Sequence, residues 1–179
     1  MKTTTRSKAV IAGLLASAAL IGGCASGSKP DAMVAQVVAP VHKNDGDVSI
    51  AVSGGKETSK MGASQISNDA FAQALRESIE KAGLFSNVGA DGARYRLTSF
   101  IGKVDQPMFG FSFTVKMEVT YALKDTKSGS TVWTKDINSE YTATAGQAFA
   151  GVERLRLANE GAARENIRQA LTEMAALTL

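Results

Sequence analysis

The sequence predicts an α+β domain with the order β-α-β-β-β-α, in which a mostly antiparallel four-stranded sheet carries two helices packed on one face. Two observations lead to this prediction. Apolar residues alternate with polar ones over residues 111–124 and 131–144, which is typical of strands with one buried face. They recur every three or four positions over residues 68–82 and 152–176, which is typical of amphipathic helices.

The first strand and the first helix are expected at residues 48–52 and 68–82. The strand is short and rich in β-branched residues. The helix is expected to end at Gly83, because glycine readily adopts the left-handed conformation that closes a helix. Three polar residues can cap its start, namely Ser67, Asn68 and Asp69. Its apolar stripe consists of Phe71, Ala74, Leu75, Ile79 and Ala82.

Three consecutive strands are expected next, over residues 95–104, 111–124 and 131–144. The middle one alternates most strictly, so its apolar positions should share the buried face. These positions are Phe111, Phe113, Val115, Met117, Val119, Tyr121 and Leu123. Residues 125–130 are expected to form the turn to the last strand, whose inward positions are Trp133, Ile137 and Tyr141.

A long helix over residues 152–176 completes the domain. Its apolar stripe comprises Leu155, Ala158, Ala162, Ala163, Ile167, Leu171, Met174 and Leu177. We expect Glu160 to form ion pairs with Arg156 and Arg164 on the solvent-exposed face of this helix. Gly161 costs about 1 kcal/mol relative to alanine in a helix interior, so a close approach of the sheet is expected there.

The chain begins with the pattern of a secretory signal peptide, residues 1–23. Lys2, Arg6 and Lys8 form a positive segment. The apolar run that follows is about 13 residues long, which is shorter than the roughly 20 residues that a membrane-spanning helix needs. Small residues then lead to Cys24, the only cysteine in the chain. An ordinary secretory signal followed by a chance cysteine is the alternative.

The residues Ile21-Gly22-Gly23-Cys24, placed behind this signal, resemble the lipobox of bacterial lipoproteins. The resemblance implies cleavage before Cys24 and acylation of its sulfur and its new amino group, and two or more acyl chains anchor a protein stably to a membrane. Ala25 stands where an aspartate tends to retain Gram-negative lipoproteins in the inner membrane. The implied location is therefore the outer membrane, with the domain facing the periplasm.

Residues 24–47 are predicted to be the lipidated cysteine and a flexible tether to a single domain, residues 48–179. The tether is rich in turn-forming residues, and a loose coil of this length spans roughly 25 Å. Residues 33–41 are apolar and do not fit a pure linker. We expect them to pack on the domain as an edge strand or another packed segment, with docking on a partner as the alternative.

The charge of the mature chain gives no case for a nucleic-acid partner. Removing the three basic residues of the signal leaves 17 basic and 17 acidic side chains, and no basic cluster is interleaved with aromatic residues. The expected partners are the membrane, through the anchor on Cys24, and an envelope protein.

The element order over most of residues 48–179 also resembles the small domain of LptE-like and YajG-like envelope lipoproteins. The resemblance rests on this order, on the helix of residues 68–85 and on the run of residues 154–167 in the last helix. Those relatives are assembly or accessory proteins, so the resemblance implies a role that is not enzymatic.

Residues suited to catalysis or metal binding are sparse. His42 is the only histidine and lies in the tether, which leaves no Ser-His-Asp triad and no multi-histidine metal site in the domain. Gly54-Gly55-Lys56 is followed by Glu57, whereas a phosphate-binding loop needs Ser or Thr after the lysine. We predict no catalytic, cofactor or metal site, and an envelope enzyme is the least supported hypothesis.

Two stretches are candidates for recognition. Pro107, Met108 and Phe109 form an unusually apolar connection between two strands, and exposed apolar patches mark partner or membrane contacts. Phe149 precedes the last helix and either joins the same surface or plugs the end of the sheet. For Met108 and Phe109 the alternative is that they cap the core.

The favoured hypothesis is therefore an interaction or assembly accessory module at the outer membrane. A carrier of a lipid or another apolar ligand is the second hypothesis, and it requires an apolar cavity between the helices and the sheet.

Overall fold

Four strands form one sheet in chain order. The computed structural model describes residues 25–36, 43–60, 62–89 and 91–179. The strands are β1 (Val48–Ser53), β2 (Tyr95–Asp105), β3 (Ser112–Asp125) and β4 (Thr131–Thr144). β2, β3 and β4 pair antiparallel, as expected for strands joined by tight connections. β1 pairs parallel with β2, because the chain crosses over through a helix between them.

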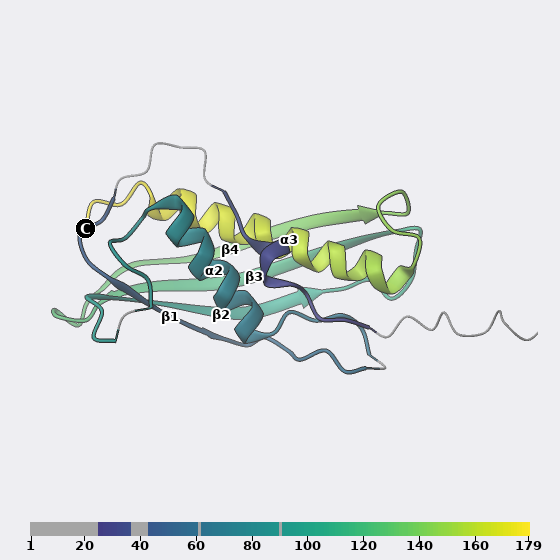
Figure 1. The fold of residues 1–179 in the computed structure, drawn as a ribbon, viewed down its shortest axis with the longest axis horizontal. Helices are drawn as coiled ribbons and strands as arrows, with labels where there is room; N and C mark the ends of the chain where they lie inside the picture. Colours follow the sequence, from purple (N-terminus) through teal and green to yellow (C-terminus); the bar gives the residue numbers. More distant parts are fainter. Residues whose placement is uncertain (1–24, 37–42, 61, 90) are drawn as a thin grey trace, which may run out of the picture.

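Two long helices, α2 (Asn68–Ala82) and α3 (Gly151–Met174), lie across one face of this sheet (Figure 1). Ser67 caps α2 by accepting a hydrogen bond from the backbone N–H of Ala70 at 3.2 Å. Gly83 ends α2 with a φ of 65°, as its sequence position predicts. None of the helices in the described part of the chain combines the length and the hydropathy that crossing a membrane requires. The α+β prediction is confirmed.

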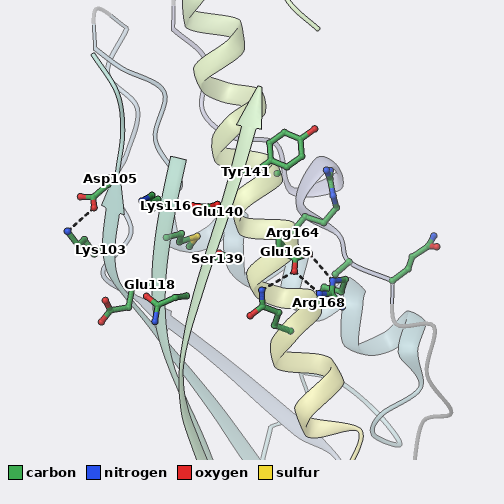
Figure 2. A pocket seen from close by; sticks show the side chains of 16 residues that line it. Lys103, Asp105, Lys116, Glu118, Ser139, Glu140, Tyr141, Arg164, Glu165 and Arg168 are labelled. Carbon is green, nitrogen blue, oxygen red and sulfur yellow. Dashed lines mark hydrogen bonds and ion pairs between the residues drawn. The ribbon is translucent and has the colours of Figure 1, made fainter. Parts of the chain in front are cut away.

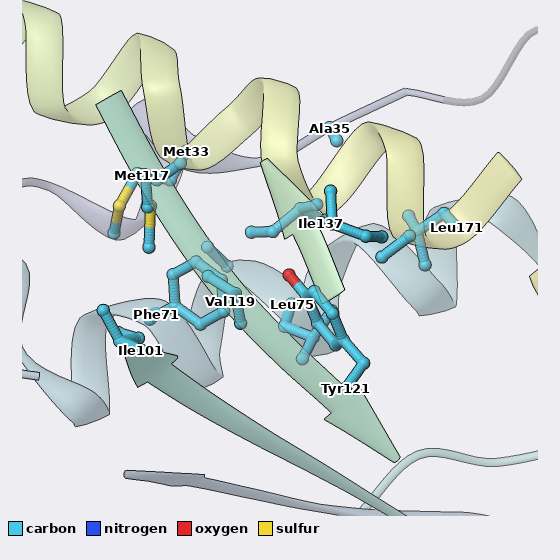
Figure 3. Packing of buried hydrophobic residues seen from close by; sticks show 14 of the residues in the cluster. Met33, Ala35, Phe71, Leu75, Ile101, Met117, Val119, Tyr121, Ile137 and Leu171 are labelled. Atoms are coloured by element: carbon cyan, nitrogen blue, oxygen red, sulfur yellow. The ribbon is translucent and has the colours of Figure 1, made fainter. Parts of the chain in front are cut away.

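The core lies between the sheet and the helices (Figure 3). The alternation predicted for β3 holds from Phe113 onward, but the strand begins at Ser112, and Phe111 lies exposed in the preceding loop. Tyr121 is fully buried, and its hydroxyl donates a hydrogen bond to Asn166 Oδ1 at 2.8 Å. Burial raises the pKa of Tyr121, so the phenol stays protonated.

A short helix, α1 (Pro30–Met33), packs against both α2 and α3. Met33 and Ala35 are buried, and the backbone N–H of Ala35 donates to Ser78 Oγ at 2.9 Å. The expectation that residues 33–41 pack on the domain is confirmed for residues 33–36, which form helix and extended chain and not an edge strand. Residues 37–42 lie outside the described residues, and with them His42.

The prediction that Glu160 pairs with Arg156 and Arg164 on the solvent-exposed face of α3 is wrong in its location and in one of its partners. Arg156 and Glu160 are paired but buried, because the N-terminal segment covers this side of the helix. Arg164 does not pair with Glu160 and instead donates to the carbonyl oxygen of Ala32 at 2.8 Å. Residues 25–36, expected to belong to a tether, therefore lie against the domain and bury a second side of α3.

Gly161 lies where Tyr141 of the sheet packs closely against α3. A Cβ at this position would lie 2.2–2.7 Å from three ring atoms of Tyr141 on β4, which is closer than carbon atoms can pack. The close approach predicted from the glycine is confirmed.

We expect Gly161→Ala to lower the free energy of unfolding by about 1–3 kcal/mol, because the clash with the Tyr141 ring outweighs the gain in helix propensity of about 1 kcal/mol. Urea unfolding followed by circular dichroism measures the change. The same substitution in a Tyr141→Ala background should be neutral or stabilising. Equal losses in the two backgrounds would contradict the assigned contact.

Candidate functional site

Two loops at one end of the sheet expose large apolar side chains. Met108, Phe109 and Phe111 in the β2–β3 loop are 91%, 85% and 90% exposed, and Phe149 in the β4–α3 loop is 98% exposed. Val152 in the first turn of α3 is also exposed, whereas Pro107 is half-buried. We call Met108, Phe109, Phe111, Phe149 and Val152 the apolar end. The alternatives of a core cap and of a plug in the sheet are wrong for these residues.

The two loops lie side by side because of strand pairing. Ser112, the first residue of β3, pairs with Thr144, the last residue of β4, so the loops that flank these residues leave the sheet together. Arg154 then clamps the loops to each other. Its guanidinium donates to the carbonyl oxygens of Ala148 and Phe149 at 2.9 and 2.6 Å and to that of Gly110 at 3.3 Å. The two candidate stretches thus form one surface, and sequence analysis missed the arginine that joins them.

A partly buried polar network holds the base of the β2–β3 loop. The side-chain amide of Gln106 donates to Asn159 Oδ1 and to the carbonyl oxygen of Ser64, both at 2.8 Å. Gln65 donates to Gln106 Oε1 at 3.2 Å. Asn159 is fully buried and also donates to the carbonyl oxygen of Ser64, at 2.9 Å. This network fixes the residue that precedes Pro107 against α3 and the chain before α2.

The N-terminal segment is fastened next to this network. The backbone N–H of Ser28 donates to the carbonyl oxygen of Gln65 at 3.0 Å, and that of Lys29 donates to Glu160 Oε1 at 2.9 Å. Arg156 bonds both Glu160 and Glu153. The hydrogen bond with Glu153 raises the pKa of Arg156 and lowers that of Glu153, so both stay charged at neutral pH. Cys24 and the signal residues lie outside the described residues.

A hollow of about 700 Å³ lies along the edge of β4 (Figure 2). Its charged lining is Lys103, Asp105, Lys116, Glu118, Glu140, Arg164, Glu165 and Arg168. Three ion pairs join six of these groups, at N–O distances of 2.7 Å (Lys103–Asp105), 2.6 Å (Arg168–Glu165) and 4.0 Å (Lys116–Glu140). Such a lining suits water and polar groups, and it does not favour the apolar ligand that a lipid carrier would hold.

Among the carboxylates of this lining, Asp105, Glu140 and Glu165 are each paired with a cation. Within the described ranges, no group of three or more His, Cys, Asp or Glu residues could hold a metal ion.

The fold is similar to that of a Xanthomonas campestris protein of the DUF330 family. The two align with a TM-score of 0.59 and 9% identity, over 79% of this chain and 92% of that chain. A candidate lipoprotein from Caulobacter crescentus aligns at 0.49 and 19% identity, over 72% of this chain and 87% of its own. A minor lipoprotein from Acinetobacter baumannii aligns at 0.47 and 11%, over 76% and 94%. No family model and no curated protein sequence matches the chain. At such identities the likeness to the DUF330 protein concerns the fold alone.

We expect Arg154→Met to loosen both loops of the apolar end, because three carbonyl oxygens lose a charged donor. The free energy of unfolding should fall by about 1–2 kcal/mol, and amide hydrogen exchange should accelerate in residues 106–111 and 145–150. The matched control is Arg168→Met on the same helix, which removes only an exposed ion pair and should cost less than about 1 kcal/mol. Unchanged exchange in the two loops would rule out the clamp.

Glu160→Gln should destabilise the protein by about 3 kcal/mol, since it leaves Arg156 buried without one of its carboxylates. It should also free the N-terminal segment, so that amide hydrogen exchange in residues 28–35 becomes faster than in the wild type. Glu165→Gln is the matched control, because its partner Arg168 is exposed, and its effect should stay below about 1 kcal/mol. Equal effects of the two substitutions would contradict the role of the buried pair.

Proposed function

We propose that the protein is an envelope lipoprotein, anchored through acyl chains on Cys24 to the periplasmic face of the outer membrane. There it serves as an interaction or assembly accessory module and not as an enzyme. The observation that carries the proposal is the apolar end, where four large apolar side chains are at least 85% exposed on two adjacent loops. Contiguous apolar surface of this kind marks a site of contact with a partner or a membrane.

The place of the anchor supports this proposal. The lipobox-like residues Ile21-Gly22-Gly23-Cys24 precede a described chain that begins at Ala25. Figure 1 shows the described chain beginning at the end of the molecule where the β2–β3 and β4–α3 loops lie. An anchor at Cys24 would therefore bring the apolar end close to the membrane. The order of helices and strands resembles that of LptE-like and YajG-like lipoproteins, and this resemblance supports an accessory role.

The polar groups of the interior support a role without catalysis. Asn166 accepts from Tyr121 and donates to the carbonyl oxygen of Ile137 at 2.9 Å, while Asn159 is engaged by the loops before α2 and β3. Arg156 and Glu160 hold the N-terminal segment. These side chains are occupied in fastening elements together, and none of them opens into the hollow beside β4.

The proposal is tested first by its anchor. The full chain is expressed in a Gram-negative host, the envelope is separated on a sucrose gradient, and the protein is weighed by mass spectrometry. We expect the wild type in the outer-membrane fraction with acyl chains on Cys24. Cys24→Ser should lose both the acyl mass and this location. Ala25→Asp is the matched control and should keep the acyl mass while moving to the inner membrane.

A wild-type protein that lacks acyl chains would contradict the proposed anchor.

The interaction surface is tested by a photo-reactive residue at Phe109, with Lys127 in the opposite hairpin as the control position. Adducts with lipid or protein at Phe109 and none at Lys127 support the surface, whereas equal yields at both positions contradict it.

A further inference from the structure

We propose that the apolar end inserts into the lipid surface of the membrane that holds the anchor, so that the domain stands on the bilayer on its two loops. This inference rests on the proposed acylation of Cys24 and names the partner of the same surface. It follows from the short length of the chain between Cys24 and Ser28, which we call the leash, from the position of the apolar end and from the composition of the two loops.

The leash between the anchor and the fixed part of the chain is very short. The backbone N–H groups of Ser28 and Lys29 are bonded to Gln65 and Glu160, and Met33 is fully buried. Only four residue steps separate Cys24 from Ser28, which limits the distance between their Cα atoms to about 14 Å. The tether of roughly 25 Å expected from composition would have held the domain clear of the headgroups. A leash half as long keeps this end of the domain at the membrane.

The leash and the apolar end are joined by a short chain of contacts. Gln65 accepts the hydrogen bond of Ser28 through its backbone carbonyl oxygen and donates through its side-chain amide to Gln106, at 3.0 and 3.2 Å. Gln106 directly precedes Pro107 and the exposed Met108. The residue from which the leash starts and the β2–β3 loop are therefore neighbours, and acyl chains on Cys24 would draw both toward the same lipid surface.

The two loops have the composition that entry into lipid requires. Residues 106–111 and 145–150 contain no charged side chain, whereas the opposite hairpin turn holds Asp125 and Lys127. Unpaired backbone carbonyl groups are costly in an apolar medium. The carbonyl oxygens of Gly110, Ala148 and Phe149 already accept hydrogen bonds from Arg154. The loops thus present phenylalanine and methionine side chains outward with part of their backbone already satisfied.

A bilayer fits this surface better than a protein partner does. The short leash brings the apolar end to the membrane interface, and a protein bound there would have to occupy the space between the domain and the bilayer. Exposed apolar side chains on two adjacent loops can enter the boundary between headgroups and acyl chains without any matching groove.

The test uses the mature, acylated protein, reconstituted in phosphatidylethanolamine and phosphatidylglycerol vesicles whose acyl chains carry bromine, a contact quencher of tryptophan. Trp133, the only tryptophan, is replaced by Phe, and a tryptophan is introduced by Phe109→Trp, by Phe149→Trp or, as the matched control, by Lys127→Trp. We expect brominated lipid to remove more than half of the fluorescence at positions 109 and 149 and to leave position 127 unchanged. Positions 109 and 149 are almost fully exposed, so these substitutions spare the core.

The outcomes separate this inference from the proposed function. If the protein is acylated and bound to vesicles but neither position 109 nor position 149 is quenched, insertion is overturned and the anchor stands. If the purified protein carries no acyl chains, the proposed anchor fails first. Photo-crosslinking from Phe109 in intact envelopes distinguishes the occupants, because a discrete protein adduct in place of lipid adducts would assign the apolar end to a protein and overturn insertion.

Discussion

The buried carboxylate of Glu160 is the interaction on which the arrangement of this molecule depends. It accepts a hydrogen bond from the backbone of Lys29 and pairs with the guanidinium of Arg156 inside the protein. A buried charge needs such partners, since an unpaired one costs several kcal/mol. The pair therefore does more than join two side chains of α3. It fastens the N-terminal segment to the domain and sets the place from which the chain leaves toward Cys24.

At the apolar end, hydrogen bonds fix the bases of the β2–β3 and β4–α3 loops, while the loops expose apolar side chains. Gln106 and Asn159 bind the base of the β2–β3 loop inside the protein, and Arg154 joins this loop to the β4–α3 loop. Beyond these bonds, Phe109 and Phe149 stay exposed. The charged hollow lies along the edge of β4 and remains open to water. The domain thus has an apolar surface at one end and a polar one on its side.

Sequence periodicity predicted the sheet and both long helices, because each of these elements buries one face and the spacing of its apolar residues marks that face. It failed at Phe111, where the alternation continues past the point at which strand pairing stops. It failed again at Arg156 and Glu160, since an i,i+4 pair of opposite charges has the same sequence pattern whether it is exposed or buried. Arg154 gave no local signal at all, because its partners are carbonyl oxygens in loops that meet only after the strands pair.

The sequence by itself determined the fold class, the ends of α2, the close approach at Gly161 and the apolar character of the two loops. All of these depend on local conformational preference or on the period of apolar residues. Only the tertiary structure decided that the loops meet at one end, that Met108 and Phe109 face outward, and that residues 25–36 lie against the domain. These features depend on contacts between residues far apart in the chain, which no local pattern records.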